Sequence, residues 1–149
     1  EGEKHGCKQV IFKDPHRGDA IEELGGMNVF FIFGKENKIV TPELTGTILE
    51  GVTRSSLIQL AKDRGMTVEE RAITLTEWRE GVANGDITEI FACGTAAVVA
   101  PIGKLKAEDF EIPAPTEHFG EISKSLREEL VGIQLGTVED RHGWMTRLI

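Results

Sequence analysis

Two short, continuously apolar segments constrain the fold of this chain more than any other feature. Residues 29–33 read Val-Phe-Phe-Ile-Phe, and residues 90–100 are apolar except for Gly94 and Thr95. A short apolar run without alternation is typical of a strand that is buried on both faces. Neither run approaches the roughly 18 residues that a membrane-spanning helix needs. Both segments are therefore expected to be interior strands of a globular domain, and no membrane association is expected.

Shorter segments predict further strands around these two. β-branched and aromatic residues gather at residues 8–12, at residues 39–41 and within residues 67–73, and turn-forming residues follow each of the first two segments. A hairpin is expected through residues 110–112. These segments lie far enough apart to allow both tight hairpins and longer crossovers between strands.

Helical spacing of apolar residues predicts helices over residues 54–64 and 121–135 and a short helix after Thr74. Thr53 is expected to cap the first helix, and Thr74 with Glu77 has the pattern of a capping box. Strands and helices are therefore mixed along the chain. This arrangement indicates an α/β or α+β single domain with a mixed sheet.

Composition excludes several classes of protein. The 149 residues carry a net charge of −8, whereas a dedicated nucleic-acid binder would carry a basic face. Cys7 and Cys93 cannot make a disulfide framework, so a reducing cytoplasm is the expected location. No metal site is predicted, because the four histidines are scattered without ligand spacing, at His5, His16, His118 and His142.

Residues 51–56, Gly-Val-Thr-Arg-Ser-Ser, are the first candidate site. A flexible glycine precedes a helix start, and hydroxyl groups gather in the first turn. Free backbone N–H groups and the positive end of the helix dipole make such a place an anion site, above all for phosphate. The alternative, favoured for this segment taken alone, is that Thr53 only caps the helix and Gly51 only forms a turn.

Residues 93–97, Cys-Gly-Thr-Ala-Ala, interrupt the second apolar run. A glycine inside a strand often marks a bulge or the close approach of a ligand. Thr95 adds a hydroxyl group where a core would prefer valine, and the small Ala96 and Ala97 leave room for a bulky group. The alternative is a tightly packed β core in which the threonine hydroxyl is satisfied internally.

Residues 23–28, Glu-Leu-Gly-Gly-Met-Asn, place a carboxylate just before the first apolar run. Glu22 and Glu23 are adjacent, so in an extended segment their side chains point to opposite faces and one of them can point inward. A buried carboxylate needs a cation or a hydrogen-bond donor as its partner. The protonated ring nitrogen of a cofactor is one such partner, and an arginine is the alternative.

Together these segments give the chain a resemblance to a known family. Residues 23–31, 51–57, 89–96 and 132–136 resemble, in this order, stretches in the C-terminal part of branched-chain amino-acid aminotransferases. These are fold-type-IV enzymes that use pyridoxal 5′-phosphate (PLP). The resemblance extends over nearly the whole chain and is strongest to the bacterial, particularly the actinobacterial, branch. It implies a mixed sheet, or pseudo-barrel, with surrounding helices.

The resemblance also implies roles for individual residues. Glu23 matches the carboxylate that pairs with the pyridine nitrogen of PLP and keeps it protonated, so that the ring can act as an electron sink. Val52 and Thr53 match the pair at a helix start that holds the cofactor phosphate, and Thr95 matches a second hydroxyl group on that phosphate. The residues implied beside the substrate carboxylate, through their backbone N–H groups, are Gly26 and Ala96.

The chain departs from the family pattern in two respects. The Schiff-base lysine of the family lies upstream of the matching region, and no lysine of this chain stands in the matching motif. Residues 1–149 are therefore expected to be the C-terminal, cofactor-binding domain of a longer polypeptide, without a catalytic residue of their own and inactive alone. Mammalian members also carry a Cys-x-x-Cys pair where this chain has Ala97 and Ala100, so no thiol switch is expected.

The implied activity is transfer of an amino group between L-leucine, L-isoleucine or L-valine and 2-oxoglutarate. The implied partners are these small molecules, the rest of the polypeptide and a second copy of the protein in a homodimer, with neither nucleic acid nor membrane. Two alternatives stay open. One is a D-amino-acid aminotransferase or an aminodeoxychorismate lyase of the same fold, and the other is a non-catalytic phosphate-binding module, which the missing lysine favours.

Overall fold

The computed structural model describes residues 2–148 of the chain. Its centre is a five-stranded sheet with the strand order β5-β4-β3-β6-β7. β4 and β5 are parallel, and all other neighbours are antiparallel, so the predicted mixed sheet is confirmed. The five strands are β3 (Asn28–Phe33), β4 (Lys38–Thr41), β5 (Thr67–Glu70), β6 (Ile87–Gly94) and β7 (Val98–Pro101).

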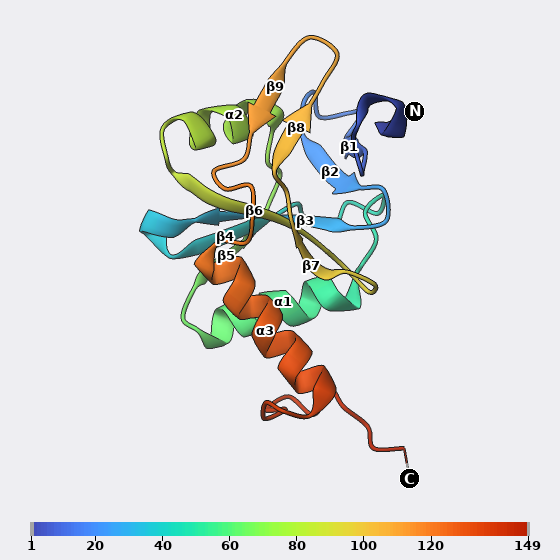
Figure 1. The fold of residues 1–149 in the computed structure, drawn as a ribbon, viewed down its shortest axis with the longest axis vertical. Helices are drawn as coiled ribbons and strands as arrows, with labels where there is room; N and C mark the ends of the chain where they lie inside the picture. Colours follow the sequence, from blue (N-terminus) through green and yellow to red (C-terminus); the bar gives the residue numbers. More distant parts are fainter. Residues whose placement is uncertain (1, 149) are drawn as a thin grey trace.

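The other elements surround this sheet (Figure 1). Two small antiparallel pairs are formed by β1 with β2 and by β8 with β9. The bounds of these elements are β1 (Ile11–Lys13), β2 (Ile21–Leu24), β8 (Lys104–Lys106), β9 (Glu111–Pro113), α1 (Val52–Asp63), α2 (Leu75–Ala83), α3 (Glu121–Leu135) and the 3-10 segments η1 (Gly2–His5) and η2 (Gly34–Glu36).

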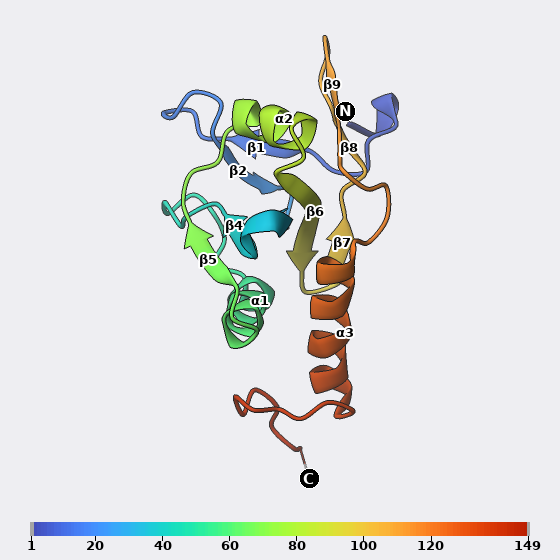
Figure 2. The same cartoon turned by 90° about the vertical axis from the view of Figure 1, so that its left-hand side faces the viewer.

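Both faces of the sheet are covered. Figure 2 shows α2 on one face and α1 and α3 on the other. Phe30 and Ile32 of β3 pack in the cluster under α1 and α3, whereas Val29, Phe31 and Phe33 pack in the cluster that contains Trp78 of α2. Side chains of a strand alternate between faces, so β3 supplies both cores at once. Every residue of β3 is buried, which confirms the prediction for residues 29–33.

The second apolar run folds differently from the expectation. The sequence predicted one strand interrupted by Gly94, but β6 ends at Gly94 and the chain returns as β7 in an antiparallel hairpin. Thr95 and Ala96 therefore lie in the connecting turn and are exposed. Val98, the first residue of β7, has a left-handed φ of 57°. The interruption is therefore a turn between two strands and not a bulge within one, because cross-strand pairing, which local patterns do not report, reverses the chain here.

The start of α1 also differs from the prediction. Gly51, not Thr53, is the N-cap: it is extended (φ −68°, ψ 129°), and its carbonyl accepts the first helical hydrogen bond from the Ser55 amide at 3.0 Å. Thr53 thus lies inside the first turn. At α2 the predicted cap is confirmed, since the Thr74 hydroxyl accepts from the Glu77 amide at 3.0 Å.

One predicted strand has different bounds. The strand expected at residues 8–12 forms later, as β1, where its partner β2 is available. The strand expected within residues 67–73 is confirmed as β5, which pairs in parallel with β4. The hairpin expected through residues 110–112 and the helix expected over residues 121–135 are confirmed as β8–β9 and α3.

Candidate functional site

Three segments that lie far apart in the sequence meet at one end of the central sheet. They are the turn between β2 and β3, the start of α1 and the turn between β6 and β7, and all three lie on the right-hand side in Figure 1. β3 begins at this end and its antiparallel neighbours β4 and β6 finish there. Loops at such a sheet end are held by a rigid scaffold and are a usual place for binding residues.

Glu23 lies on β2 and is half-buried. One of its carboxylate oxygens, Oε2, accepts a hydrogen bond from the backbone N–H of Leu49 at 3.3 Å. Within residues 2–148 no side-chain nitrogen of lysine, arginine or histidine lies within 4.0 Å of an oxygen of this carboxylate. The arginine that the sequence left open as its partner is therefore absent from the described chain, and the other carboxylate oxygen can accept a further hydrogen bond.

Leu49 connects this carboxylate to α1. Its carbonyl oxygen accepts hydrogen bonds from the Asn28 side-chain amide at 3.0 Å and from the Gly51 backbone N–H at 2.9 Å. Gly51 is the N-cap of α1, so the distance along the chain from the Glu23 contact to the helix start is only two residues.

The first turn of α1 presents unused hydrogen-bond donors. Gly51 has no side chain with which to cap the helix, so the backbone N–H groups of Val52, Thr53 and Arg54 lack a capping partner in the described chain. Val52 is 81% exposed, and the Thr53 hydroxyl also finds no partner within residues 2–148. These groups and the positive end of the helix dipole favour an anion at this position.

The serine hydroxyls in the same turn are already occupied. Ser55 and Ser56 both donate to the Val52 carbonyl, at 2.9 and 3.0 Å. Of the hydroxyl groups that the sequence placed in this segment, only that of Thr53 is therefore available to a ligand.

The third segment closes the arrangement. A Cβ atom at Gly94 would lie 3.1 Å from Cγ of Met27 and 3.4 Å from the carbonyl oxygen of Gly26, so the ends of the two turns touch. Gly26 has a φ of +85°, a left-handed conformation that favours glycine. Three segments thus meet at this sheet end. They are the end of β2 with its following turn (Glu23 and Gly26), the start of α1 (Val52 and Thr53) and the β6–β7 turn (Thr95 and Ala96).

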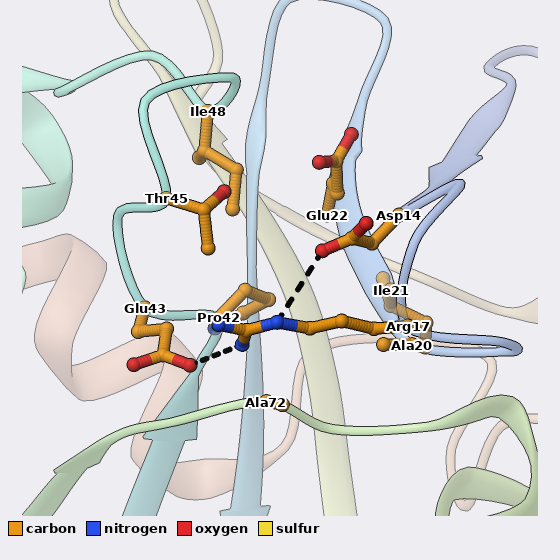
Figure 3. A pocket seen from close by; sticks show the side chains of 10 residues that line it. All are labelled: Asp14, Arg17, Ala20, Ile21, Glu22, Pro42, Glu43, Thr45, Ile48 and Ala72. Carbon is orange, nitrogen blue, oxygen red and sulfur yellow. Dashed lines mark hydrogen bonds and ion pairs between the residues drawn. The ribbon is translucent and has the colours of Figure 1, made fainter.

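A separate pocket lies on the other side of β2 (Figure 3). It is lined by Glu22, not by Glu23, as expected for adjacent strand residues. The Arg17 guanidinium crosses the pocket and pairs with Glu43 and, at 3.6 Å, with Asp14. This pocket contains none of the predicted site residues, and its Arg17 is already paired with Asp14 and Glu43.

Two further expectations concern absences. No cluster of three or more potential metal-ligating side chains occurs within residues 2–148. None of the helices in that range is long and apolar enough to cross a membrane.

Sequence reasoning missed Asn28 and Arg54, which are 6% and 4% exposed. The Arg54 guanidinium donates to the Pro42 carbonyl at 2.9 Å and to Glu70 at 2.8 Å, and its Nε has no partner in the described chain. The available signal at Asn28 was a polar residue directly before an apolar run, whereas Arg54 stands among polar residues and gave no such signal. Near them, burial raises the pKa of the Cys93 thiol to about 12, so this cysteine stays protonated at neutral pH.

Two kinds of group are free at this sheet end. One is the half-buried Glu23 carboxylate, which has no cationic side chain at ion-pair distance within residues 2–148 and can accept a hydrogen bond from a protonated ligand group. The other is the set of uncapped N–H groups at the start of α1, which favours an anion.

Comparisons with known proteins agree with this reading. A family profile described as amino-transferase class IV matches residues 1–105. The chain is 50% identical over 145 residues to a branched-chain-amino-acid aminotransferase of Mycolicibacterium smegmatis, a match that covers 96% of this chain and 39% of the relative. The chain therefore spans about two fifths of the length of that relative.

Two solved structures have the same architecture. The crystal structure of a branched-chain amino acid aminotransferase from Escherichia coli superposes with a TM-score of 0.79 and 27% identity, covering 97% of this chain and 43% of the other. The enzyme from Thermobaculum terrenum, described as a PLP-form, superposes with a TM-score of 0.75 and 30% identity, covering 97% and 43%. The predicted fold class is confirmed by these similarities.

Proposed function

Because the chain belongs to the amino-transferase class IV family, we propose that the full-length protein is a PLP-dependent branched-chain amino-acid aminotransferase. It would transfer the amino group between L-leucine, L-isoleucine or L-valine and 2-oxoglutarate. The observation that carries the proposal is the meeting of Glu23, the uncapped start of α1 and the Thr95 turn in a chain 50% identical to a relative of that name. Residues 1–149 then form the cofactor-binding part of a longer polypeptide.

PLP, when bound, supplies a protonated pyridine ring that takes up the electron pair left at the substrate α-carbon after proton removal. In this chain the carboxylate of Glu23 would accept the hydrogen bond of the ring nitrogen and keep it protonated, because a nearby anion favours the charged form. The Leu49 N–H holds that carboxylate in position at 3.3 Å.

The phosphate would be held at the opposite side. The backbone N–H groups of Val52 and Thr53 and the hydroxyl groups of Thr53 and Thr95 are the donors. Helix α1 has 12 residues, so its dipole is fully developed at this end. Two anchors at opposite ends of a flat ring fix its orientation toward the group that removes the proton.

Substrate would lie beside the two turns that touch each other. The backbone N–H groups of Gly26 and Ala96 have no acceptor within residues 2–148 and can donate to the substrate carboxylate. The Schiff-base lysine would be contributed by a part of the polypeptide upstream of this chain. We further infer that the full-length protein is a homodimer and lies in the cytoplasm. The free cysteines Cys7 and Cys93 are compatible with that location, because neither depends on an oxidising compartment.

The substrate class is tested with the full-length protein and PLP. Turnover of L-leucine with 2-oxoglutarate is expected, and turnover of D-alanine alone would instead support a D-amino-acid aminotransferase. Bound PLP without any transamination would support the non-catalytic phosphate-binding alternative.

The role of Glu23 is tested by Glu23→Gln. The rate constant of proton abstraction is expected to fall on the order of a hundredfold, as for loss of one positioned electrostatic partner. PLP should remain bound, because the phosphate contacts are intact. Glu22→Gln is the matched control, since Glu22 is the neighbouring carboxylate and accepts a hydrogen bond from the Thr47 hydroxyl. Unchanged turnover in Glu23→Gln would remove Glu23 from its assigned role.

A further inference from the structure

We propose that Asn28 is a positioning residue that holds Glu23 and the start of α1 in register with each other through the backbone of Leu49. The inference rests on the proposed function, because it concerns the two ends of the same cofactor site. Asn28 itself would touch neither the cofactor nor the substrate.

Asn28 occupies a rigid position. It is the first residue of β3, it pairs with Cys93 of β6, and only 6% of it is exposed. Its Nδ2 donates to the Leu49 carbonyl at 3.0 Å. A buried amide is costly to leave without a partner, so this bond ties the Leu49 segment to the central sheet.

The other side of the same amide defines where α1 begins. A Cβ atom at Gly51 would lie 2.4 Å from Oδ1 of Asn28, so a side chain at this position would displace the Asn28 amide from its present place. The absence of a side chain at Gly51 therefore lets the amide stay where it bonds to Leu49. The amide thus lies directly against the N-cap residue, whose carbonyl starts the helix by accepting from Ser55.

Leu49 transmits this constraint to Glu23. Its N–H donates to Glu23, while its carbonyl accepts from Asn28 and from Gly51. The loop that contains Leu49 is largely exposed, so it has little packing to hold it otherwise. Without the Asn28 bond, both the direction of the Glu23 carboxylate and the position of the first helical N–H groups are expected to loosen together.

The test uses the full-length protein with Asn28→Ser and Asn28→Ala. The controls are Asn37→Asp and Asn37→Gly, which remove the same kind of bond, from Nδ2 of Asn37 to the Gly65 carbonyl at 3.2 Å, at the other end of α1, and which suit the left-handed φ of 47° at this position. Two dissociation constants are measured, for PLP and for pyridoxal, which lacks the phosphate. The protonation of the bound ring nitrogen is followed by 15N NMR against pH.

In the Asn28 variants we expect PLP to bind about tenfold more weakly, which corresponds to loss of one hydrogen bond. Pyridoxal binding should weaken as well, because Glu23 is also displaced. The pH midpoint of ring-nitrogen deprotonation should fall, since a displaced carboxylate stabilises the protonated ring less. When Asn28→Ser is combined with Glu23→Gln, the double variant should weaken pyridoxal binding by less than the sum of the two single-variant free-energy changes, because both substitutions act through one contact.

Hydrogen exchange of the Leu49 N–H gives a readout that is independent of cofactor. It should be faster in the Asn28 variants and unchanged in the Asn37 variants. If the Asn28 variants keep both dissociation constants within twofold and the same pH midpoint as the wild type, the inference is wrong and Asn28 only stabilises the fold. If the wild type itself binds no PLP, the proposed function fails, and this inference fails with it.

Discussion

Glu89 offers a quantitative test of how α3 is attached to the sheet. This residue lies on β6, only 6% of it is exposed, and its carboxylate accepts from two backbone N–H groups at the start of α3, Ile122 at 3.0 Å and Ser123 at 2.8 Å. The N-cap residue of α3, Gly120, makes no side-chain cap of its own. The first-turn donors of this helix are thus satisfied by a carboxylate from another element.

Glu89→Gln keeps the shape of the side chain and removes its charge. The amide oxygen can serve one of the two donors, but the amide nitrogen then faces the other, which is left without a partner. Loss of one charge-assisted hydrogen bond costs about 2 kcal/mol, and loss of the favourable charge at the helix start costs about 0.5 kcal/mol more. The local stability of α3 should therefore fall by about 2–3 kcal/mol.

Hydrogen exchange in the full-length protein measures this loss directly. The amides of Ile122 and Ser123 should exchange at least roughly 30-fold faster in Glu89→Gln, since about 1.4 kcal/mol corresponds to a factor of ten. Glu128→Gln is the matched control, because Glu128 is exposed on the same helix and pairs only with Lys124 at 3.9 Å. Equal exchange rates in the two variants would refute the idea that the buried carboxylate caps α3.

Three further predictions follow from other groups. Arg54→Met should destabilise the fold by about 2 kcal/mol in thermal unfolding, because the Pro42 carbonyl loses a buried donor; an unchanged melting temperature would contradict this. Iodoacetamide at pH 8 should label Cys7 much faster than Cys93, whose pKa burial raises to about 12; equal rates in the native protein would count against this assignment. Hydrogen bonds from His142 and Gln59 hold the pKa of Asp63 below its ordinary value of 3.8. The stabilisation from ionised Asp63 is therefore present above pH 3.8 and is lost as the pH falls through the lower pKa of the folded state. The melting temperature of Asp63→Asn should therefore decline less steeply with acidification than that of the wild type. An equally steep decline in both proteins would contradict this linkage.

Local patterns were sufficient for the elements that bury their side chains in a regular pattern. The unbroken apolar run at residues 29–33 predicted a strand buried on both faces, and β3 is one. The spacing of apolar residues predicted the helix over residues 121–135, which α3 matches. The reason is that a strand or a helix buries its side chains with a fixed period, and this period is visible in the sequence before any partner is known.

The candidate site was accessible to the sequence only in part. The three motifs around Glu23, Thr53 and Thr95 could be singled out separately, and each alone also had a plain structural reading. Their meeting at one end of the sheet depends on the strand order β4-β3-β6 and on two turns that touch, and no local pattern contains that information.

The sequence by itself determined where most of the strands and helices lie, because periodicity and turn residues act over a few neighbouring positions. Only the tertiary structure showed that α1 begins at Gly51 and not at Thr53, and that the amide of Asn28, 23 positions earlier, lies beside that glycine. It likewise decided that Glu89 caps a helix that starts more than 30 residues later. Hydrogen bonds between distant residues form only after the sheet has brought them together, and therefore leave no periodic trace in the chain.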